Sequence, residues 1–298
     1  MTGNMAVENV ATQLPPRVNE FKRFRRVFLG RGVVVFGLIV LLFFIIIAVF
    51  APLIAPYDPY ETDVGNALLQ PSRHHLLGTD AVGRDILSRI IFGSRTSLLI
   101  GLTVVAISTL IGTILGVLAG YYGGWIQTVI MRLIDAYMAF PMIILALMVS
   151  SLLGGGIKNV VIALSVAMMP GYARLMCGQT MHIKENDYIM AERSLGAGNF
   201  NIMFRHIVPN CLSPLIVMVT MMLGSVILAE AGLSFLGVGI TPPTAAWGSM
   251  VNEGRPYLTT SPFLAFSPGI AIMLVVFAFN MVGDGLRDAI DPSLRGTI

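Results

Sequence analysis

The chain has 298 residues, of which 55% are apolar and only 12% are charged. A water-soluble domain carries about 25% charged residues, so this composition excludes an ordinary soluble enzyme or binding module. The net charge of +3 is small and its basic residues gather beside apolar segments, which argues against nucleic acid as a partner. Several apolar runs exceed the roughly 18 residues that a bilayer span needs, and they predict an integral membrane protein.

Residues 1–32 are predicted to form a cytoplasmic N-terminal tail. The second half of this tail contains six basic residues, namely Arg17, Lys22, Arg23, Arg25, Arg26 and Arg31. They suit anionic headgroups on the cytoplasmic side of a membrane. Residues 33–54 are the first predicted transmembrane helix, which is too long to be the apolar core of a cleaved signal peptide. Residues 55–96 carry prolines and many charges, so we expect an extracytoplasmic loop.

Residues 97–298 are predicted to hold five further transmembrane helices. We place them at about residues 97–119, 126–153, 160–176, 211–228 and 263–282. The span 126–153 should kink at Pro141, because proline removes a helix hydrogen bond. The stretch after residue 228, with Glu230 and the Pro242-Pro243 pair, is expected to be a re-entrant or surface segment rather than a straight helix.

The span 97–119 and the residue after it carry a glycine every four residues, at Gly112, Gly116 and Gly120. Such a stripe of small residues lets another helix approach closely in a membrane. We therefore expect a helix-packing face here, and it is a candidate contact for a second membrane subunit.

The distribution of lysine and arginine predicts the orientation of the chain. With a cytoplasmic N-terminus and six crossings, thirteen of the 19 basic residues lie inside and six lie outside. Basic residues are enriched in cytoplasmic loops, so both termini are predicted to be cytoplasmic. The largest internal polar segment, residues 177–209, is then cytoplasmic as well.

Motifs for catalysis are absent from the sequence. It contains no Walker A loop and no common hydrolase, zinc-protease or thiol signature, and its four histidines lack metal-ligand spacing. We therefore expect no ATPase or other enzyme activity, no cofactor and no metal site. Arg132 and Asp135 are expected to pair on one helix face. Glu230 has two open interpretations, since it could line a pathway or reach headgroup water.

The segment Asp187–Asn210 resembles the coupling loop of binding-protein-dependent ABC importers. In that loop an EAA triplet precedes a glycine and, further on, a proline. Met190-Ala191-Glu192 occupies the triplet position, Gly196 the glycine and Pro209 the proline, with spacing closer to the family than residue identity. Tyr188–Leu195 can form a short amphipathic helix, which Gly196 can end by adopting a positive φ. We expect this helix to contact an ATPase.

Other stretches resemble the shorter permease subunit of dipeptide, oligopeptide and nickel importers. They are Leu77-Gly78-Thr79-Asp80, Gly83-Arg84-Asp85 and Ser88-Arg89 in the outer loop, Pro242-Pro243 with Trp247-Gly248, and Asn280–Asp288 followed by Asp291-Pro292. The roles of Asp80, Arg84 and Asp85 do not follow from spacing. A hydrogen-bonded turn under the outer gate and a contact with the binding protein or partner permease both remain open.

This resemblance implies an all-α, type I ABC importer permease with six transmembrane helices in a prokaryotic inner membrane. It also implies a second permease subunit, two cytoplasmic ATP-binding ATPase subunits and an extracytoplasmic solute-binding protein. The implied function is ATP-driven uptake of di- or oligopeptides, with nickel, glutathione or another small solute as alternatives. A secondary transporter is more remote, because ion-coupling residues and inverted repeats are not found. We expect the pathway around Pro141, Pro170 and Met218.

Overall fold

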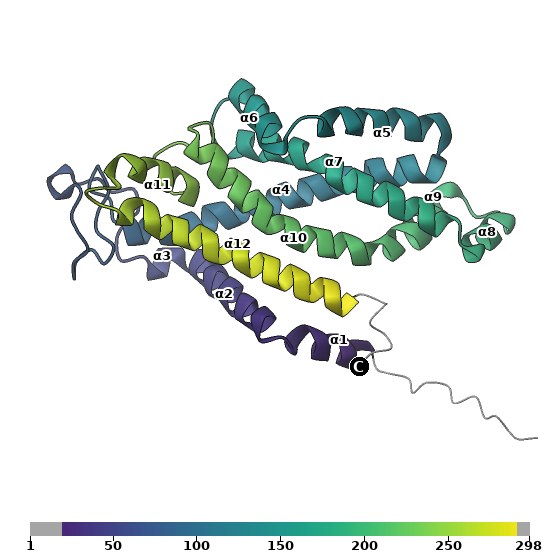
Figure 1. The fold of residues 1–298 in the computed structure, drawn as a ribbon, viewed down its shortest axis with the longest axis horizontal. Coiled ribbons are helices and arrows are strands. Elements are labelled where there is room, and N and C mark those ends of the chain that lie inside the picture. Colours follow the sequence, from purple (N-terminus) through teal and green to yellow (C-terminus); the bar gives the residue numbers. More distant parts are fainter. Residues whose placement is uncertain (1–19, 291–298) are drawn as a thin grey trace, which may run out of the picture.

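A computed structural model describes residues 20–290 as an elongated bundle of helices (Figure 1). The helices are α1 (Glu20–Leu29), α2 (Gly32–Val49), α3 (Ala51–Ile54), α4 (Ile86–Tyr122), α5 (Gly124–Met138), α6 (Met142–Leu153), α7 (Ile157–Lys184), α8 (Asp187–Ser194), α9 (Asn199–Asn201), α10 (Val208–Phe235), α11 (Trp247–Gly254) and α12 (Phe263–Ile290). Short 3-10 turns lie at Val64–Asn66 and Arg255–Tyr257, and a π-helical turn, Ile202–Ile207, precedes α10.

Five helical segments in the described part of the chain are long and apolar enough to cross a membrane. They are α2, α4, α7, α12 and the segment from α9 through α10, and the bent pair of α5 and α6 makes a sixth when it is counted as one span. This confirms the predicted all-α membrane fold. The predicted kink at Pro141 is a complete break, because α5 and α6 meet at 89°. Pro141 has no N–H to continue a helix, so it stands just before the first residue of α6.

Several helices extend further than the sequence predicted. α4 begins at Ile86, well before residue 97, because its charged and hydroxyl side chains find buried partners near the end of the bundle. Residues 177–184 of the predicted loop 177–209 continue α7. The expected re-entrant segment after residue 228 is wrong in its first part, since Glu230 lies within α10 and hydrogen-bonds there. The chain leaves that helix only after Phe235.

The predicted tail 1–32 is partly helical. Residues 1–19 lie outside the described residues, as does the Asp291-Pro292 part of the C-terminal motif. The remainder forms α1, where Phe24 and Phe28 stack with their rings 5.5 Å apart. Arg31 pairs with Asp288 at the end of α12. A helix forms here because an amphipathic segment has a neighbouring helix end to cover its apolar face.

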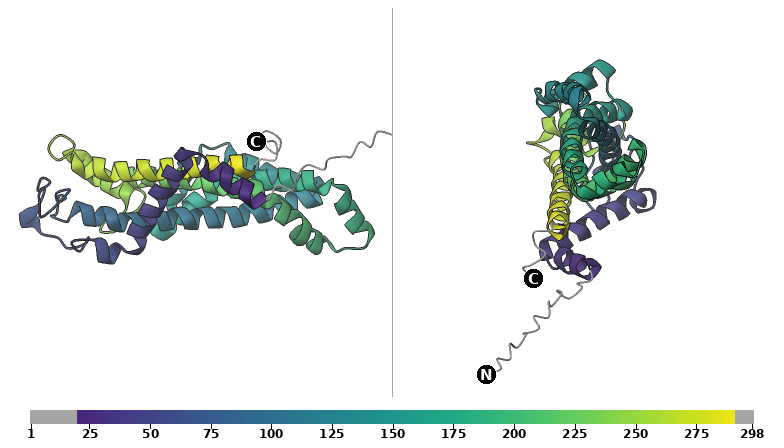
Figure 2. Two further views of the ribbon diagram at one scale, coloured as in Figure 1. Left: turned by 90° about the horizontal axis from the view of Figure 1, so that it is seen from below. Right: turned by 90° about the vertical axis from the view of Figure 1, so that its right-hand side faces the viewer.

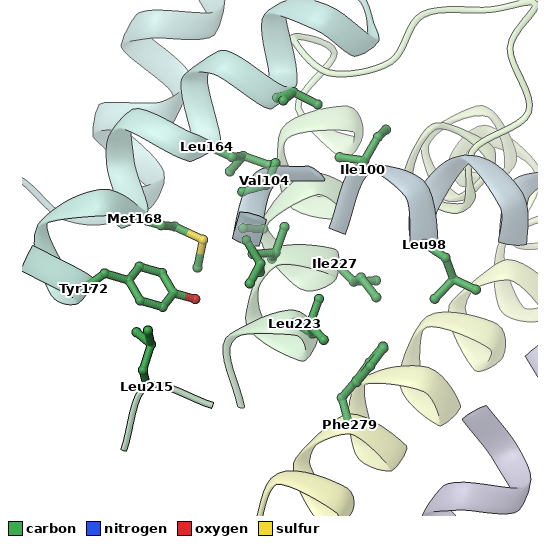
Figure 3. Close-up of a cluster of buried hydrophobic side chains, with 14 of the residues drawn as sticks. Leu98, Ile100, Val104, Leu164, Met168, Tyr172, Leu215, Leu223, Ile227 and Phe279 are labelled. Atoms are coloured by element: carbon green, nitrogen blue, oxygen red, sulfur yellow. The ribbon is translucent and has the colours of Figure 1, made fainter. Parts of the chain in front are cut away.

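The core lies where α4, α7, α10 and α12 meet (Figure 3). Val104, Leu164 and Ile227 come from three of these helices and are buried there, and Phe279 of α12 closes the cluster. Apolar side chains elsewhere on the long helices, such as Leu102, face outward. An apolar core beneath an equally apolar outer surface suits lipid as the surrounding solvent.

The glycine stripe packs against α7 of the same chain. A Cβ on Gly112 would lie 2.5 Å from the Cβ of Tyr172, and one on Gly116 would lie 2.6 Å from the Cβ of Met176. At Gly120 the corresponding distance to the Cβ of Thr180 is 2.8 Å. The stripe therefore packs against a helix of the same chain, and α7 covers it where the sequence left a second subunit as a candidate contact.

The bundle has two distinct ends. α3, α11 and the long loop between α3 and α4 lie at one end, whereas α8 and α9 project from the other (Figures 1 and 2). The described chain ends, at α1 and at the last turn of α12, lie toward the same end as α8. This arrangement agrees with the orientation that the basic residues predict, with both termini and the segment around α8 on one side.

Candidate functional site

α8 and the turn after it have the geometry expected of a short helix closed by glycine. The helix is shifted by one residue from the predicted Tyr188–Leu195, and Gly196 follows it with φ at 84°. The amide of Gly196 donates to the Arg193 carbonyl and the amide of Ala197 donates to the Glu192 carbonyl, each at 3.0 Å. This double hydrogen bond is the Schellman closure, in which a left-handed residue satisfies the last carbonyls of a helix.

The segment from α8 to α10 has one face in the bundle and one face in solvent. Ile189 of α8 is fully buried and joins Ile202 and Ile207 in the main core. Large apolar side chains cover the opposite face, namely Tyr188, Met190, Leu195, Phe200 and Phe204, and Leu195 is 84% exposed. Exposed apolar side chains at the end of a bundle, beyond its long helices, mark a surface for another protein.

The remaining residues predicted for this segment are brought into one neighbourhood. The side chain of Glu192 lies 3.8 Å from that of His206, and the side-chain Nδ2 of Asn210 donates to the Tyr188 hydroxyl at 3.3 Å. Ala191 is exposed beside Glu192. Pro209 stands in the first turn of α10, directly after the π-helical turn Ile202–Ile207.

A groove of about 380 Å³ lies at the break between α5 and α6. Pro141, Pro170 and Met218, the residues around which the sequence placed a pathway, all line it. Its walls hold further methionines, at Met138, Met142, Met168 and Met222. Thioether side chains are flexible and polarizable, so such a surface can adapt to partners of different shape.

An ion pair joins α5 to α7, but its partners differ from those expected. Asp135 of α5 accepts a hydrogen bond from Arg174 of α7 at 2.5 Å, and both side chains are about half exposed. The expected pairing of Asp135 with Arg132 on one helix face is therefore wrong. Tertiary packing brings Arg174 of α7 within hydrogen-bonding distance, and the pair joins α5 to α7.

The outer motif folds into a hydrogen-bonded turn. One Asp80 carboxylate oxygen accepts from the amides of Val82 and Arg84 at 3.0 and 2.9 Å, and the other accepts from Nε of Arg84 at 2.6 Å. Asp85 caps α4 by accepting from the amide and the hydroxyl of Ser88 at 2.8 and 2.7 Å. The motif therefore sets the start of α4, since a capping carboxylate satisfies its first amides.

The rest of the motif presses this turn against the preceding loop. The Thr79 hydroxyl donates to the Asn66 carbonyl at 2.5 Å. Gly78 and Gly83 have φ values of 81° and 84°, and a Cβ on either would overlap a backbone carbonyl of that loop. Side chains are excluded at both positions by conformation and by space.

A buried charge cluster joins this turn to α11. Glu253 accepts hydrogen bonds from Arg84 at 2.8 Å and from Arg89 at 3.2 Å, and Asp80 lies 3.6 Å from Arg89. The Arg89 side chain is 1% exposed. Sequence reasoning missed Glu253, although a lone acidic residue between two apolar spans was an available signal.

Glu230 occupies neither of the two positions left open for it. It is 1% exposed in α10, and one carboxyl oxygen accepts from the Ser234 hydroxyl at 2.8 Å. The Ser234 oxygen also accepts from the amide of Ile240 at 3.0 Å. Glu230 thus neither lines an open groove nor reaches the surface, and it supports the loop that follows α10.

Comparison with solved structures identifies the fold. A chain of the inward-facing MetNI methionine ABC transporter superposes with a TM-score of 0.56 at 18% identity, covering 69% of this chain and 98% of that one. The chain therefore has the fold of a type I ABC importer permease. Within that class, the chain belongs to the family of binding-protein-dependent transport system inner membrane components, whose pattern matches residues 112–296. Residues 20–71 match the N-terminal transmembrane domain of oligopeptide transport permease C.

Relatives with known names share most of the chain. A glutathione transport system permease protein from Pectobacterium atrosepticum is 44% identical over 276 residues, which is 92% of each chain. A dipeptide transport system permease protein from Alkalihalophilus pseudofirmus is 41% identical over 288 residues, or 97% of this chain and 93% of that one. A second glutathione permease protein, from Escherichia coli, is 45% identical and covers 93% of this chain.

Proposed function

We propose that this chain forms, with a second permease subunit, the membrane pathway of an importer for di- or oligopeptides, driven by ATP hydrolysis on two cytoplasmic partner subunits. The observation that carries the proposal is the segment from α8 to α10. It projects from the bundle, its inner face is anchored in the core, and its outer face is apolar and exposed. Such a segment can pass a push from an ATPase into the helices, which couples two distant sites.

The choice of solute rests on the relatives and on the groove. Permeases named for dipeptide and for glutathione transport share most of this sequence, and glutathione is itself a small peptide. The groove is lined by methionine and proline rather than by charged side chains. A deformable, uncharged lining fits solutes whose side chains vary. Glutathione is therefore the second candidate solute after di- and oligopeptides, and like them it is a peptide.

The same groove is our candidate for the pathway itself. It lies where α5 breaks from α6 and where Pro170 interrupts the hydrogen bonds of α7. Irregular backbone inside a membrane is tolerated where it lines a cavity rather than lipid. The outer motif and Glu253 would hold the extracytoplasmic end, where a solute-binding protein delivers its cargo.

Purification of the tagged chain from its native membrane tests the assembly. We expect a second permease, ATPase subunits and a solute-binding protein to co-purify, and the complex in vesicles to take up radiolabelled dialanine in an ATP-dependent manner. Reduced glutathione, tested in parallel, distinguishes the two solutes. A verified single chain that hydrolyses ATP, or uptake driven by a proton gradient without ATP, would contradict the proposal.

A further inference from the structure

Tyr121 stands at the cytoplasmic end of α4 and contacts α7, α8 and α9. The segment from α8 to the start of α10 is the proposed coupling element, and α7 leads into it. The guanidinium neighbour of Tyr121 is Arg193 of α8, whose central carbon lies 5.2 Å from the ring centroid, and its ammonium neighbour is Lys184 at the end of α7, at 5.9 Å. The Tyr121 hydroxyl donates to Oδ1 of Asn199 in α9 at 2.8 Å. One side chain of α4 thus bridges α7, α8 and α9.

The burial of Tyr121 sets it apart from its neighbour. Tyr121 is 3% exposed, whereas Tyr122 is 46% exposed and meets it edge to face. Cations that lie over an aromatic face are attracted by the ring, and partial desolvation strengthens that attraction. The contact is therefore directional, because the ring attracts Arg193 and Lys184 and the hydroxyl donates to Asn199.

α4 is placed to carry a displacement from this contact to the opposite end of the molecule. It runs without a break from Ile86 to Tyr122 and packs against α7 along the glycine stripe. Arg89, near its first turn, belongs to the charge cluster with Asp80 and Glu253. A single continuous helix thus has Tyr121 at the ATPase end and the outer charge cluster at the other.

We infer that Tyr121 is the positioning residue through which movement of the coupling element enters α4. The inference rests on the proposed function, since it presumes that α8 is moved by an ATPase. Ile189, the other buried anchor of α8, lies in the main core, where its apolar contacts are non-directional. Tyr121 holds α8 through its ring and α9 through its hydroxyl, so those elements move with α4.

The test uses the whole complex in vesicles, with Tyr121→Leu, Tyr121→Phe and the matched control Tyr122→Leu. The readouts are ATP hydrolysis and uptake of dialanine or reduced glutathione, whichever the parental vesicles accumulate. We expect Tyr121→Leu to assemble and hydrolyse ATP while uptake per ATP falls at least about tenfold. Tyr121→Phe keeps the ring and should restore that ratio to within about twofold of the parental value. Tyr122→Leu should match the parental complex.

A second variant covers the outcome in which Tyr121→Leu does not assemble. Replacing both Arg193 and Lys184 with alanine leaves the ring in place and removes its cations, and it should lower the same ratio. An unchanged ratio in an assembled Tyr121→Leu complex, or in the double variant when Tyr121→Leu does not assemble, overturns the inference. Gly196→Val separates this inference from the proposed function. If Gly196→Val abolishes coupling while uptake per ATP is unchanged in Tyr121→Leu, only the role of Tyr121 fails. If Gly196→Val changes neither ATP hydrolysis nor uptake, the coupling role of α8 fails as well.

Discussion

At Gly196 the backbone conformation, rather than crowding, requires glycine. Its φ is 84°, and no atom lies within 4 Å of a Cβ placed there. A β-branched residue in this left-handed conformation costs about 1–2 kcal/mol. A cost of that size lowers the equilibrium constant for forming the native turn about 5- to 30-fold.

We therefore expect Gly196→Val to abolish solute-stimulated ATP hydrolysis and uptake in reconstituted vesicles, while capture of solute by the binding protein survives. Gly196→Asn is the matched control, because asparagine tolerates positive φ, and it should retain most activity. Glu192→Ala should be milder than Gly196→Val, since exposed ion pairs contribute only about 0–1 kcal/mol. Parental activity in Gly196→Val would show that residues 187–209 are not the coupling element.

Glu253 balances two arginines that are buried beside it. Removal of one partner from a buried ion pair costs up to about 3–5 kcal/mol, and here Asp80 remains as the one carboxylate beside both arginines. We expect Glu253→Ala to lower the Tm of the purified permease complex by several degrees, measured by thermal unfolding in detergent. Glu61→Ala, at an exposed acidic residue of the same outer loop, should leave the Tm unchanged. Equal Tm values for the two variants would show that the cluster does not hold the outer loop.

The contact between α4 and α7 is the central helix pair of the bundle. Its two backbones approach closely because the stripe on α4 lacks side chains, and close backbone approach is how membrane helices gain packing energy without a hydrophobic driving force. The stripe therefore maintains the internal fold of this subunit. A contact with the proposed partner permease would therefore use another surface.

Gly116→Leu tests this internal role. The new side chain would meet the backbone and Met176 of α7, and overpacking of this kind costs about 1–3 kcal/mol. We expect the singly expressed chain to lose its folded peak in size-exclusion chromatography. Gly178→Leu, on α7 at a position with no atom within 4 Å of a Cβ, should keep that peak. A Gly116→Leu chain that folds normally but no longer binds its partner permease would show instead that the stripe lies at the subunit interface.

The orientation of the whole molecule in the membrane can be measured by cysteine labelling. The native Cys177 and Cys211 are buried, so background labelling should be low. We expect a cysteine at residue 74 to react with an impermeant reagent in intact cells, and cysteines at residues 20 and 185 to react only after permeabilisation. This follows from the excess of basic residues on the side of α8. Labelling of residue 185 in intact cells would invert the topology.

The sequence by itself determined the features that depend on local pattern. Length and continuity of apolar runs predicted the spans, basic residues predicted their orientation, and spacing of Gly196 within Asp187–Asn210 predicted a short helix and its turn. These properties are local, because hydropathy, charge bias and backbone conformation are encoded within a few neighbouring residues. The resemblance of whole stretches predicted the family, which the comparisons confirm.

The tertiary structure alone decided which residues meet across the chain. It pairs Asp135 with Arg174 rather than Arg132, covers the glycine stripe with α7, and brings Glu253 to Arg84. It also places Tyr121 between α8 and α9. These contacts join residues far apart in the sequence, and a period of 3.6 residues says which face a side chain occupies but not which helix lies opposite. Packing of the assembled helices supplies that second piece of information.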